Sequence, residues 1–229
     1  MNAPLQIAID GPVASGKGDI AARLAIQLNL LYIYTGAMYR ALALACIRQG
    51  ISCKDENQVM EILKKITIQF VPPPEGSRYF YTILLNGEDI TERITKQDTA
   101  QGASDVGILP LVRQWMVQRQ KEMSQGKRVV MEGRDIGLRV LPNAQLKIFL
   151  TASVEERAQR RFGQWQEKGI HKTFEETLAD TKLRDLQDTT RSTDPLHKLT
   201  DAWELDTTQM DQEEVVTAII EELKRRKLI

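Results

Sequence analysis

The stretch Ile7-Ala-Ile-Asp-Gly-Pro-Val-Ala-Ser-Gly-Lys-Gly-Asp19 decides the fold of this 229-residue chain. Apolar residues that alternate up to Ile9 predict the end of a buried strand, which stops at Asp10. Gly11-Pro12 then predicts a turn. A helical spacing of apolar residues follows directly after Lys17, at Ile20, Leu24 and Leu28. The predicted order is therefore strand, glycine loop and helix.

In this context the spacing from Gly11 to Gly16-Lys17 is typical of a phosphate-binding loop. Glycines let the backbone turn several N–H groups toward one phosphate, and the start of the following helix adds the positive end of its dipole. Lys17 supplies a mobile full charge for the β and γ phosphates. A plain strand–turn–helix would leave both glycines and the lysine unexplained.

Composition and charge narrow the class of protein. The chain is 42% apolar and 27% charged, which is typical of a globular protein with one sizeable domain, or one domain with insertions. Its 31 basic and 31 acidic residues cancel, which argues against a general binder of nucleic acid or of anionic membranes. No apolar run approaches the roughly 18 residues of a membrane span, and the first residues lack a signal pattern. Cys46 and Cys53 fit free thiols in a reducing cytosol, so we expect a cytoplasmic protein.

The rest of the chain alternates short apolar strands with amphipathic helices. Further strands are predicted over 31–34, 128–131, 146–150 and 203–206, and helices over 17–29, 35–49, 56–65, 97–104, 110–125, 153–167, 173–188 and 212–226. Capping boxes, Ser153 with Glu156 and Thr173 with Glu176, open two of these helices. The alternation predicts an α/β fold with a parallel sheet of about five strands, covered by helices on both faces.

Residues 67–94 interrupt this alternation with a stretch rich in β-forming side chains. Three prolines at 72–74 separate two apolar runs, and Asn86-Gly87 is a strong hairpin signal. We therefore expect a small antiparallel sheet inserted into the α/β frame. A central pair of strands is the alternative, but the prolines favour a surface excursion.

Arginines gather at the carboxyl ends of the predicted strands, where ligands of such sheets bind. Thr35 and Arg40 follow the second strand, and Arg134 and Asp135 follow the strand at 128–131. The helix that begins at Ser153 carries Arg157, Arg160 and Arg161. A planar guanidinium suits bidentate contacts to phosphate. Any one of these arginines could form an ordinary surface ion pair, but several of them together with a phosphate loop favour phosphate binding.

A second cluster reads Arg184-Asp185-x-x-Asp188-x-x-Arg191. On a helix, Arg184, Asp188 and Arg191 would share one face, being four and three residues apart. The cluster is either a structural ladder of ion pairs or a site for an anionic or hydroxylated ligand. Two phosphate-handling regions separated by an insertion favour a phosphoryl transferase, which needs an in-line donor and acceptor, Mg²⁺ and arginines.

At these residues the chain resembles the bacterial cytidylate kinase family over essentially its whole length. The resemblance rests on Ile9-Asp-Gly-Pro12, Gly16-Lys-Gly18, Thr35-Gly-Ala-Met-Tyr-Arg40, Ala103-Ser104, Pro110 to Arg113, Gly133-Arg-Asp135, Lys147-Ile-Phe-Leu150, Glu155-Glu-Arg157, Arg160-Arg161, Glu167-Lys-Gly169 and the 184–191 cluster. Adenylate and thymidylate kinases share the loop but not this set.

The resemblance implies a P-loop three-layer α/β fold with a five-stranded parallel sheet and a short helical lid. Residues 1–35 and 97–229 would form the core domain, with the lid at about 155–170. Residues 36–96 would form the monophosphate-binding domain, with the small antiparallel β-sheet inserted at about 67–94. It also implies ATP-dependent phosphorylation of CMP and dCMP in pyrimidine metabolism, with Mg²⁺ carried by ATP and no metal ligand from the protein. A monomer is expected.

The resemblance also assigns roles to individual residues. ATP would be held by Gly11, Pro12, Val13, Ala14, Ser15, Gly16, Lys17, Gly18 and Asp19. CMP would be held by Thr35, Arg40, Ser104, Arg113, Arg134, Asp135, Arg184, Asp188 and Arg191. Among these, Arg40 and Arg134 would hold the acceptor phosphate, Ser104, Arg184 and Asp188 the sugar, and Thr35, Arg113, Asp135 and Arg191 the base. Lys17, Arg134 and Arg184 would be catalytic. The lid arginines Arg157, Arg160 and Arg161 would close over the transferring phosphate.

The expected base preference follows from hydrogen-bond chemistry. Cytosine offers an exocyclic amine to a carboxylate such as Asp135, whereas uracil would present a carbonyl there. The unmade bond would cost uracil about 1–3 kcal/mol.

The sequence departs from the family at Asp19, where a hydroxyl residue is expected near the donor phosphates. A carboxylate there would repel phosphate unless it faces a cation or solvent. Asp19 therefore keeps open a nucleotide-binding paralogue with weakened catalysis. A nucleoside-monophosphate kinase of the same fold with another base preference is a separate alternative.

Overall fold

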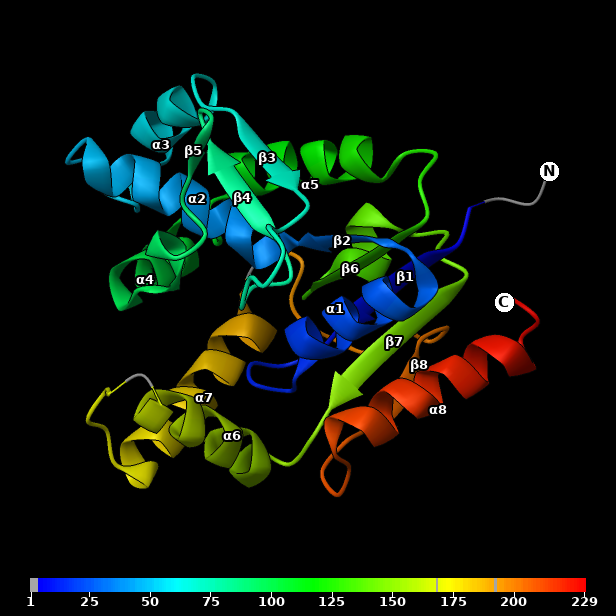
Figure 1. Cartoon of the computed structure of the whole chain (residues 1–229). Helices are drawn as coiled ribbons and strands as arrows, with labels where there is room; N and C mark the ends of the chain where they lie inside the picture. Colours follow the sequence, from blue (N-terminus) through cyan, green and yellow to red (C-terminus); the bar gives the residue numbers. More distant parts are fainter. Residues whose placement is uncertain (1–3, 168, 192) are drawn as a thin grey trace. The chain divides into compact units, whose positions relative to one another are not determined.

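The computed structural model describes residues 4–167, 169–191 and 193–229. Lys168, in the predicted lid and in the motif Glu167-Lys-Gly169, and residues 1–3 of the predicted core domain lie outside the described residues. The strands are β1 (Gln6–Asp10), β2 (Leu31–Tyr34), β3 (Ile68–Val71), β4 (Thr82–Leu85), β5 (Glu88–Asp89), β6 (Val129–Gly133), β7 (Leu146–Thr151) and β8 (Trp203–Asp206) (Figure 1). The helices are α1 (Lys17–Leu28), α2 (Thr35–Arg48), α3 (Glu56–Leu63), η1 (Arg93–Thr95), α4 (Gln97–Val106), α5 (Pro110–Ser124), η2 (Ile136–Val140), α6 (Val154–Glu167), α7 (Phe174–Thr190) and α8 (Gln212–Arg225).

The chain packs as two compact units. The first unit consists of Met1–Leu31 and Gly126–Ile229, and the second of Tyr32–Gln125. The second unit is longer than the monophosphate-binding domain predicted over 36–96, because α4 packs on α2 and α5 packs on α3. Packing and substrate binding need not divide a chain at the same residues, so the functional boundary stays a prediction.

The main sheet has five strands in the order β2-β6-β1-β7-β8, which confirms the predicted five-stranded parallel sheet. The central strand β1 pairs in parallel with β6 and β7. Its last residue, Asp10, lies opposite Gly133 on one side and Phe149 on the other. The segments that follow β1 and β6 therefore begin at the same level of the sheet, and β7 continues to Thr151 beside them, at the edge where ligands of parallel sheets bind.

Helices α1 and α8 pack on each other, and α1 also packs on β1 and β6. The core beneath them is continuous and apolar, with Ile7, Ile9 and Leu24 fully buried. A strand buried on both faces needs no polar alternation, which explains why the small apolar Ala8 stands between Ile7 and Ile9 in β1. Among the described helices, none is both long enough and apolar enough for a membrane crossing.

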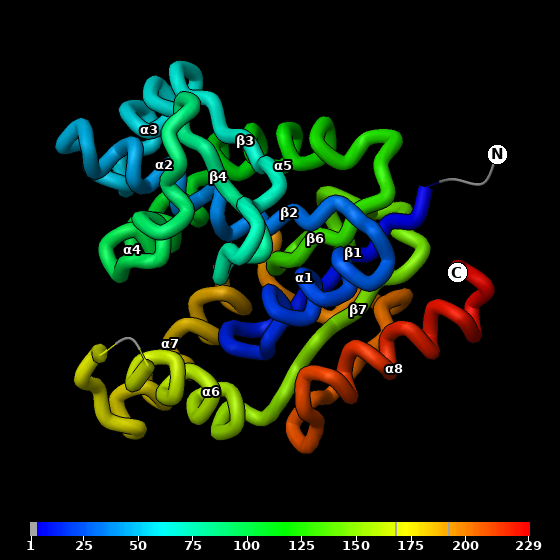
Figure 2. The backbone as a smooth tube through the Cα atoms, viewed as in Figure 1, coloured from blue at the N-terminus to red at the C-terminus, as the bar shows by residue number. Residues whose placement is uncertain are grey.

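After β7 the chain turns into α6 and returns through α7, which packs against α6 (Figure 2). The capping box at the start of α7 is complete, because Thr173 and Glu176 each accept from the other's backbone N–H. The box predicted for α6 is only half formed. Ser153 Oγ accepts from Glu156 N at 3.2 Å, but Ser153 N donates to Thr208 Oγ1 at 2.9 Å.

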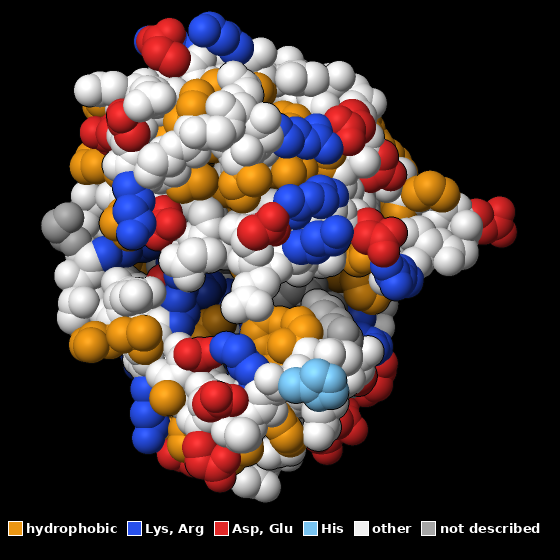
Figure 3. Space-filling view, turned by 90° about the vertical axis from the view of Figure 1, so that its left-hand side faces the viewer, with side chains coloured by type: hydrophobic (Ala, Val, Ile, Leu, Met, Phe, Trp, Pro, Cys, Tyr) orange, Lys and Arg blue, Asp and Glu red, His pale blue; other side chains and the backbone are white. Residues whose placement is uncertain are grey.

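The second unit contains the predicted antiparallel insertion as the three-stranded sheet β3-β4-β5. Asn86 and Gly87 connect β4 to β5 with φ values of 51° and 84°, so the hairpin signal is confirmed. Strand β4 starts at Thr82, three residues after the aromatic run begins at Tyr79. A buried cluster that includes Leu42, Leu63 and Ile83 joins this sheet to α2 and α3. Figure 3 shows basic and acidic side chains mixed over the face drawn, as the zero net charge suggests.

Candidate active site

The loop between β1 and α1 has a backbone that needs its glycines. Gly11 has φ +154°, and a Cβ there would lie 2.0 Å from the carbonyl oxygen of Leu150. Gly16 has φ +89° and caps the N-terminus of α1. Ala14 also has a positive φ, 58°, which costs a non-glycine residue about 1–2 kcal/mol. The loop therefore adopts the tight turn that the motif predicts.

Lys17 is buried within this loop, with 5% of its surface exposed. Its Nζ donates to the carbonyl oxygen of Pro12 at 2.6 Å and to Ser15 Oγ at 3.3 Å. The pKa of Lys17 is lowered to about 7, first by burial and then by the positive charge of Arg134, while Glu132, Asp188 and Asp10 act in the opposite direction. The ammonium is thus held in place but is only partly compensated, so an anion brought to the loop would stabilise its charged form.

Asp10 connects the phosphate loop to the segment that follows β6. Its Oδ1 accepts from Ile136 N at 2.8 Å and its Oδ2 accepts from Gly137 N at 2.8 Å. Burial raises the pKa of Asp10 to about 6, although these two hydrogen bonds act to lower it. The carboxylate therefore fixes the backbone directly after Arg134 and Asp135.

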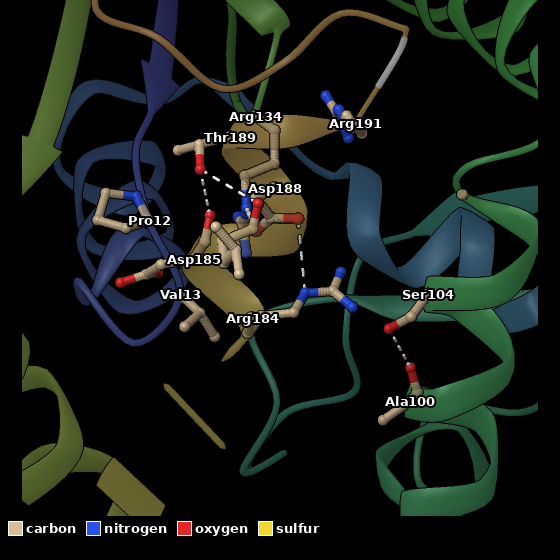
Figure 4. Close-up of polar contacts among 12 residues, drawn as sticks. Pro12, Val13, Ala100, Ser104, Arg134, Arg184, Asp185, Asp188, Thr189 and Arg191 are labelled. Carbon is tan, nitrogen blue, oxygen red and sulfur yellow. Dashed lines mark hydrogen bonds and ion pairs between the residues drawn. The ribbon is translucent and has the colours of Figure 1, made fainter. Parts of the chain in front are cut away.

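Arg134, Arg184 and Asp188 form one charge network in the first unit (Figure 4). Arg134 Nε donates to Asp188 Oδ2 at 2.6 Å, and Arg184 Nε lies 3.5 Å from Asp188 Oδ1. Burial alone would raise the pKa of Asp188, but the neighbouring arginines outweigh it and hold the pKa below its usual range. The residue pattern on α7 thus does form an ion-pair ladder, with Arg134 added from the loop after β6.

Asp135 and Arg191 form a second, weaker pair. Arg191 Nη2 lies 3.6 Å from Asp135 Oδ1, and Arg191 Nε donates to the backbone oxygen of Asp194 at 2.7 Å. The expectation that Arg191 shares a helix face with Arg184 and Asp188 stays a prediction. Helix α7 ends at Thr190, and Arg191 is its C-cap residue, whose N–H still donates to the carbonyl oxygen of Gln187. The positive charge of Arg191 is one of those that lower the pKa of Asp188.

The three arginines of the predicted lid already have protein partners. Arg157 Nη1 donates to the carbonyl oxygen of Val13 at 3.1 Å and lies 2.7 Å from Asp185 Oδ2. Arg160 bonds Glu156 and the backbone and side chain of Thr207. Arg161 lies over the ring of Trp165, 4.2 Å from its centroid. Arg157 is buried, and its contacts include the phosphate loop and α7.

Asp19 occupies the first turn of α1, where it is partly buried. Burial raises the pKa of Asp19, and the positive charge of Arg23, one turn further along the helix, acts against that rise. Arg23 is itself held by Glu213 of α8. The departure from the family pattern thus has a nearby cation, which the sequence had left undecided.

The remaining predicted acceptor residues belong to the second unit. Thr35 is buried at the start of α2, and Arg40 on the same helix donates to the backbone oxygen of Ile94 at 2.9 Å. Ser104 Oγ donates to the carbonyl oxygen of Ala100 on its own helix, at 3.1 Å. Arg113 is buried and donates to Gly107 O at 3.3 Å.

Sequence reasoning gave no role to two residues that the structure places in this network, Asp10 and Asp185. Asp10 lies inside the motif Ile9-Asp-Gly-Pro12. A carboxylate at the end of a buried strand could have indicated a buried hydrogen bond to the backbone. Asp185 stands within the 184–191 cluster, but its partner Arg157 lies on another helix. Among the described residues, no group of three or more His, Cys, Asp or Glu side chains is placed to hold a metal ion.

Comparisons with known proteins agree on one family. The family model described as "Cytidylate kinase" matches residues 7–225. A cytidylate kinase of Caldanaerobacter subterraneus subsp. tengcongensis is 44% identical over 225 residues, which is 98% of this chain and 97% of the relative. A cytidylate kinase of Anoxybacillus flavithermus is 45% identical over 220 residues, 96% of each chain. A solved structure of an uncharacterised protein from Eubacterium ventriosum has a TM-score of 0.51 at 13% identity, covering 96% of this chain and 98% of that one, which supports the fold alone.

Proposed function

The chain belongs to the cytidylate kinase family, and from this we propose that it transfers the terminal phosphoryl group of ATP to CMP or dCMP. The products would be ADP and the cytidine or deoxycytidine diphosphate. One observation supports the proposal beyond family membership. The charges of Arg134 and Asp188 both act on the pKa of Lys17 in the phosphate loop. A donor-side cation and the predicted acceptor-side network therefore share one unit of the protein.

On the donor side, the turn around Gly11 and Gly16 and the start of α1 support binding of the ATP phosphates. Lys17 would exchange its bond to the carbonyl of Pro12 for the β and γ phosphate oxygens. Binding of these anions would raise the lowered pKa of Lys17 and keep its ammonium charged.

On the acceptor side, Arg134 would hold the phosphate of CMP, and Arg184 and Asp188 would hold the sugar. Their present contacts supply a reason: Asp188 keeps both guanidinium groups oriented. In the transition state, Arg134 and Arg184 would stabilise the charge that spreads over the transferring oxygens. No general base is required, because the attacking phosphate oxygen is already anionic.

The base would be read by Asp135, with Arg191 beside it. The carboxylate would accept from the exocyclic amine of cytosine, which uracil lacks. From the second unit, Thr35 and Arg113 would complete the base contacts, Arg40 those to the phosphate and Ser104 those to the sugar. We include these four residues as part of the proposal, together with the lid at about 155–170 and the boundaries of the monophosphate-binding domain.

A magnesium ion would come with ATP and would neutralise charge between its phosphates. Asp10 and Glu132 supply carboxylates near Lys17, a neighbourhood that suits such a cation. The cytoplasmic location and the monomeric state expected from the sequence stay predictions.

The test is a coupled assay that follows ADP release at one ATP–Mg²⁺ concentration while CMP, dCMP, UMP, AMP and dTMP are titrated separately. We expect CMP and dCMP to be better substrates than UMP by about tenfold or more in kcat/KM. Equal kcat/KM values for UMP and CMP would contradict the proposed base preference. Binding of CMP without ADP release would favour the paralogue with weakened catalysis, an alternative that only Asp19 motivates.

A further inference from the structure

Arg157 connects three segments of the first unit. Its Nε donates to the carbonyl oxygen of Ala152 at 3.0 Å, its Nη1 donates to that of Val13 at 3.1 Å, and Nη1 also lies 2.7 Å from Asp185 Oδ2. The side chain is only 7% exposed. An arginine this buried, with both Nε and Nη1 engaged, is unsuited to swinging freely onto a ligand, which favours an effect through its partners.

The contact with Val13 has a direct consequence for the phosphate loop. In a trans peptide the carbonyl and the following N–H point in opposite directions. When Arg157 holds the carbonyl of Val13, it therefore also fixes the direction of the N–H of Ala14. That residue has φ 58°, a backbone conformation that a non-glycine residue keeps only when its surroundings hold it.

The contact with Asp185 links the same arginine to α7. Asp185 directly follows Arg184 and lies one turn before Asp188, so all three move with one helix. The other carboxylate oxygen of Asp185, Oδ1, is buried without a hydrogen-bond partner among the described residues. Among the described side chains, only Arg157 therefore orients this carboxylate, and a shift of α7 would reach Val13 through Arg157.

From these contacts we propose that Arg157 is a positioning residue that orients the Val13–Ala14 peptide for the donor phosphates, and that Asp185 makes this orientation depend on α7. ATP and CMP would then bind cooperatively, because each favours the arrangement in which Arg157 bridges loop and helix. This inference rests on the proposed function, since α7 would carry the acceptor contacts Arg184 and Asp188.

The first experiment uses the full chain without any nucleotide. Amide hydrogen exchange is measured on peptides that cover residues 11–17, in the wild type and in Arg157→Gln. We expect exchange in this segment to become at least about threefold faster. Asp180→Asn is the matched control, because it removes an ion pair of α7 with Lys172, away from the phosphate loop. Unchanged exchange in Arg157→Gln would overturn the positioning role and would favour an arginine that acts only on bound ATP.

The second experiment measures cooperativity by calorimetry. A non-hydrolysable ATP analogue with Mg²⁺ is titrated into protein with and without saturating CMP. In the wild type we expect CMP to tighten binding of the analogue by about fivefold or more. In Asp185→Asn we expect that factor to fall to near one, while the affinity for CMP alone changes little. Asp180→Asn should retain the factor.

The outcomes separate the inference from the function on which it rests. If the wild type phosphorylates CMP but shows no coupling, or Asp185→Asn keeps the coupling, the link through Asp185 is wrong and the proposed function stands. If CMP neither binds nor reacts, the proposed function fails, and the exchange experiment still decides the role of Arg157. Should Arg157→Gln fold poorly, Arg157→Lys takes its place, since it keeps one cationic donor and should recover part of the protection.

Discussion

Asp10 holds the backbone of Gly137: the carboxylate oxygen Oδ2 accepts the N–H of that residue at 2.8 Å, while Oδ1 holds the preceding N–H. The two residues are 127 positions apart in sequence. One buried carboxylate thus joins the strand that leads into the phosphate loop to the turn that follows Arg134 and Asp135.

This contact predicts a pH dependence of stability. Because burial raises the pKa of Asp10 from 3.8 to about 6, the native state binds its proton more tightly than the unfolded state does. The stability that comes from this proton is fully present below pH 3.8 and is lost as the pH rises to about 6. We expect the free energy of unfolding of the wild type, relative to Asp10→Asn, to fall by about 2–3 kcal/mol across that window.

Urea denaturation at several pH values checks this. Asp201→Asn is a suitable control, since Asp201 is an exposed carboxylate paired with Lys147. A difference between wild type and Asp10→Asn that does not change with pH would contradict the prediction.

Lys17 predicts that binding of ATP takes up protons. Its pKa is lowered to about 7 mainly by burial, so at pH 8 much of the side chain is neutral before the donor binds. Phosphate charges would raise that pKa and draw a proton from the buffer. Calorimetry at pH 8 in buffers with different ionisation enthalpies should show an uptake of roughly half a proton or more per ATP.

The same titration in Lys17→Met should show weaker binding and little of this uptake. An equal uptake in the variant would assign the proton to another group.

Removal of the Asp19 charge and removal of the Arg23 charge should change the KM for ATP in opposite directions. Asp19→Thr removes a negative charge near the proposed phosphate site and should lower the KM for ATP about two- to tenfold. Arg23→Gln removes the cation that offsets Asp19 and should raise this KM. In the double variant the effect of Arg23→Gln should be smaller than in the wild type.

Steady-state kinetics at fixed CMP measures all four proteins. Additive effects would mean that Arg23 does not act through Asp19, and an unchanged KM in Asp19→Thr would mean that the carboxylate faces away from the phosphates.

We predict that loss of the Asp188 carboxylate changes the KM for CMP more than the KM for ATP. Asp188→Asn leaves Arg134 and Arg184 without the carboxylate that orients them. Breaking such a buried pair should cost about 2–4 kcal/mol of stability, with the exposure of Arg184 placing it toward the lower end.

In the proposed reaction the KM for CMP should rise at least about tenfold, while that for ATP changes less. Asp180→Asn, on the exposed face of the same helix, should leave both constants near their wild-type values. Equal losses for both substrates would show that Asp188 serves the whole fold and not the acceptor.

We predict that adding a single methyl group at Gly11 destabilises the protein strongly. In Gly11→Ala the new Cβ would lie 2.0 Å from the carbonyl oxygen of Leu150, so the loop must move. We expect at least about 3 kcal/mol of destabilisation, or loss of ATP binding. Gly126→Ala is the matched control, because φ is also positive there but nothing lies within 4 Å of the added carbon, and it should cost only about 1–2 kcal/mol. Similar melting temperatures for the two variants would contradict this reading.

Local patterns in the sequence predicted the fold well, because strands, helices and turns depend on neighbouring residues. Thr173 and Glu176 form the expected capping box, and Asn86-Gly87 forms the expected hairpin. The same reasoning failed where a distant partner competes. The N–H of Ser153 is taken by Thr208, 55 residues away, so Glu156 does not complete its box and bonds Arg160 instead.

The candidate site shows the same division. A periodic spacing placed Arg184 and Asp188 together, but it could not foresee that Arg134, from the loop after β6, donates to the same carboxylate. The burial of Arg157 against Val13 and Asp185 depends on how α6 and α7 return over the phosphate loop. Spacing along one helix carries no information about such a contact.

The register of the central strands has a consequence for how this protein can vary. Asp10 and Gly133 are the last residues of β1 and β6 and lie opposite each other, so the sheet register sets where the two loops that follow them begin. Deleting one residue from β6 would draw Arg134 back by about 3.3 Å and would turn the alternate side chains of that strand to the opposite face. We therefore expect insertions and deletions to be tolerated better in the connections at the opposite edge of the sheet than in the strands, whose number of residues has to stay the same.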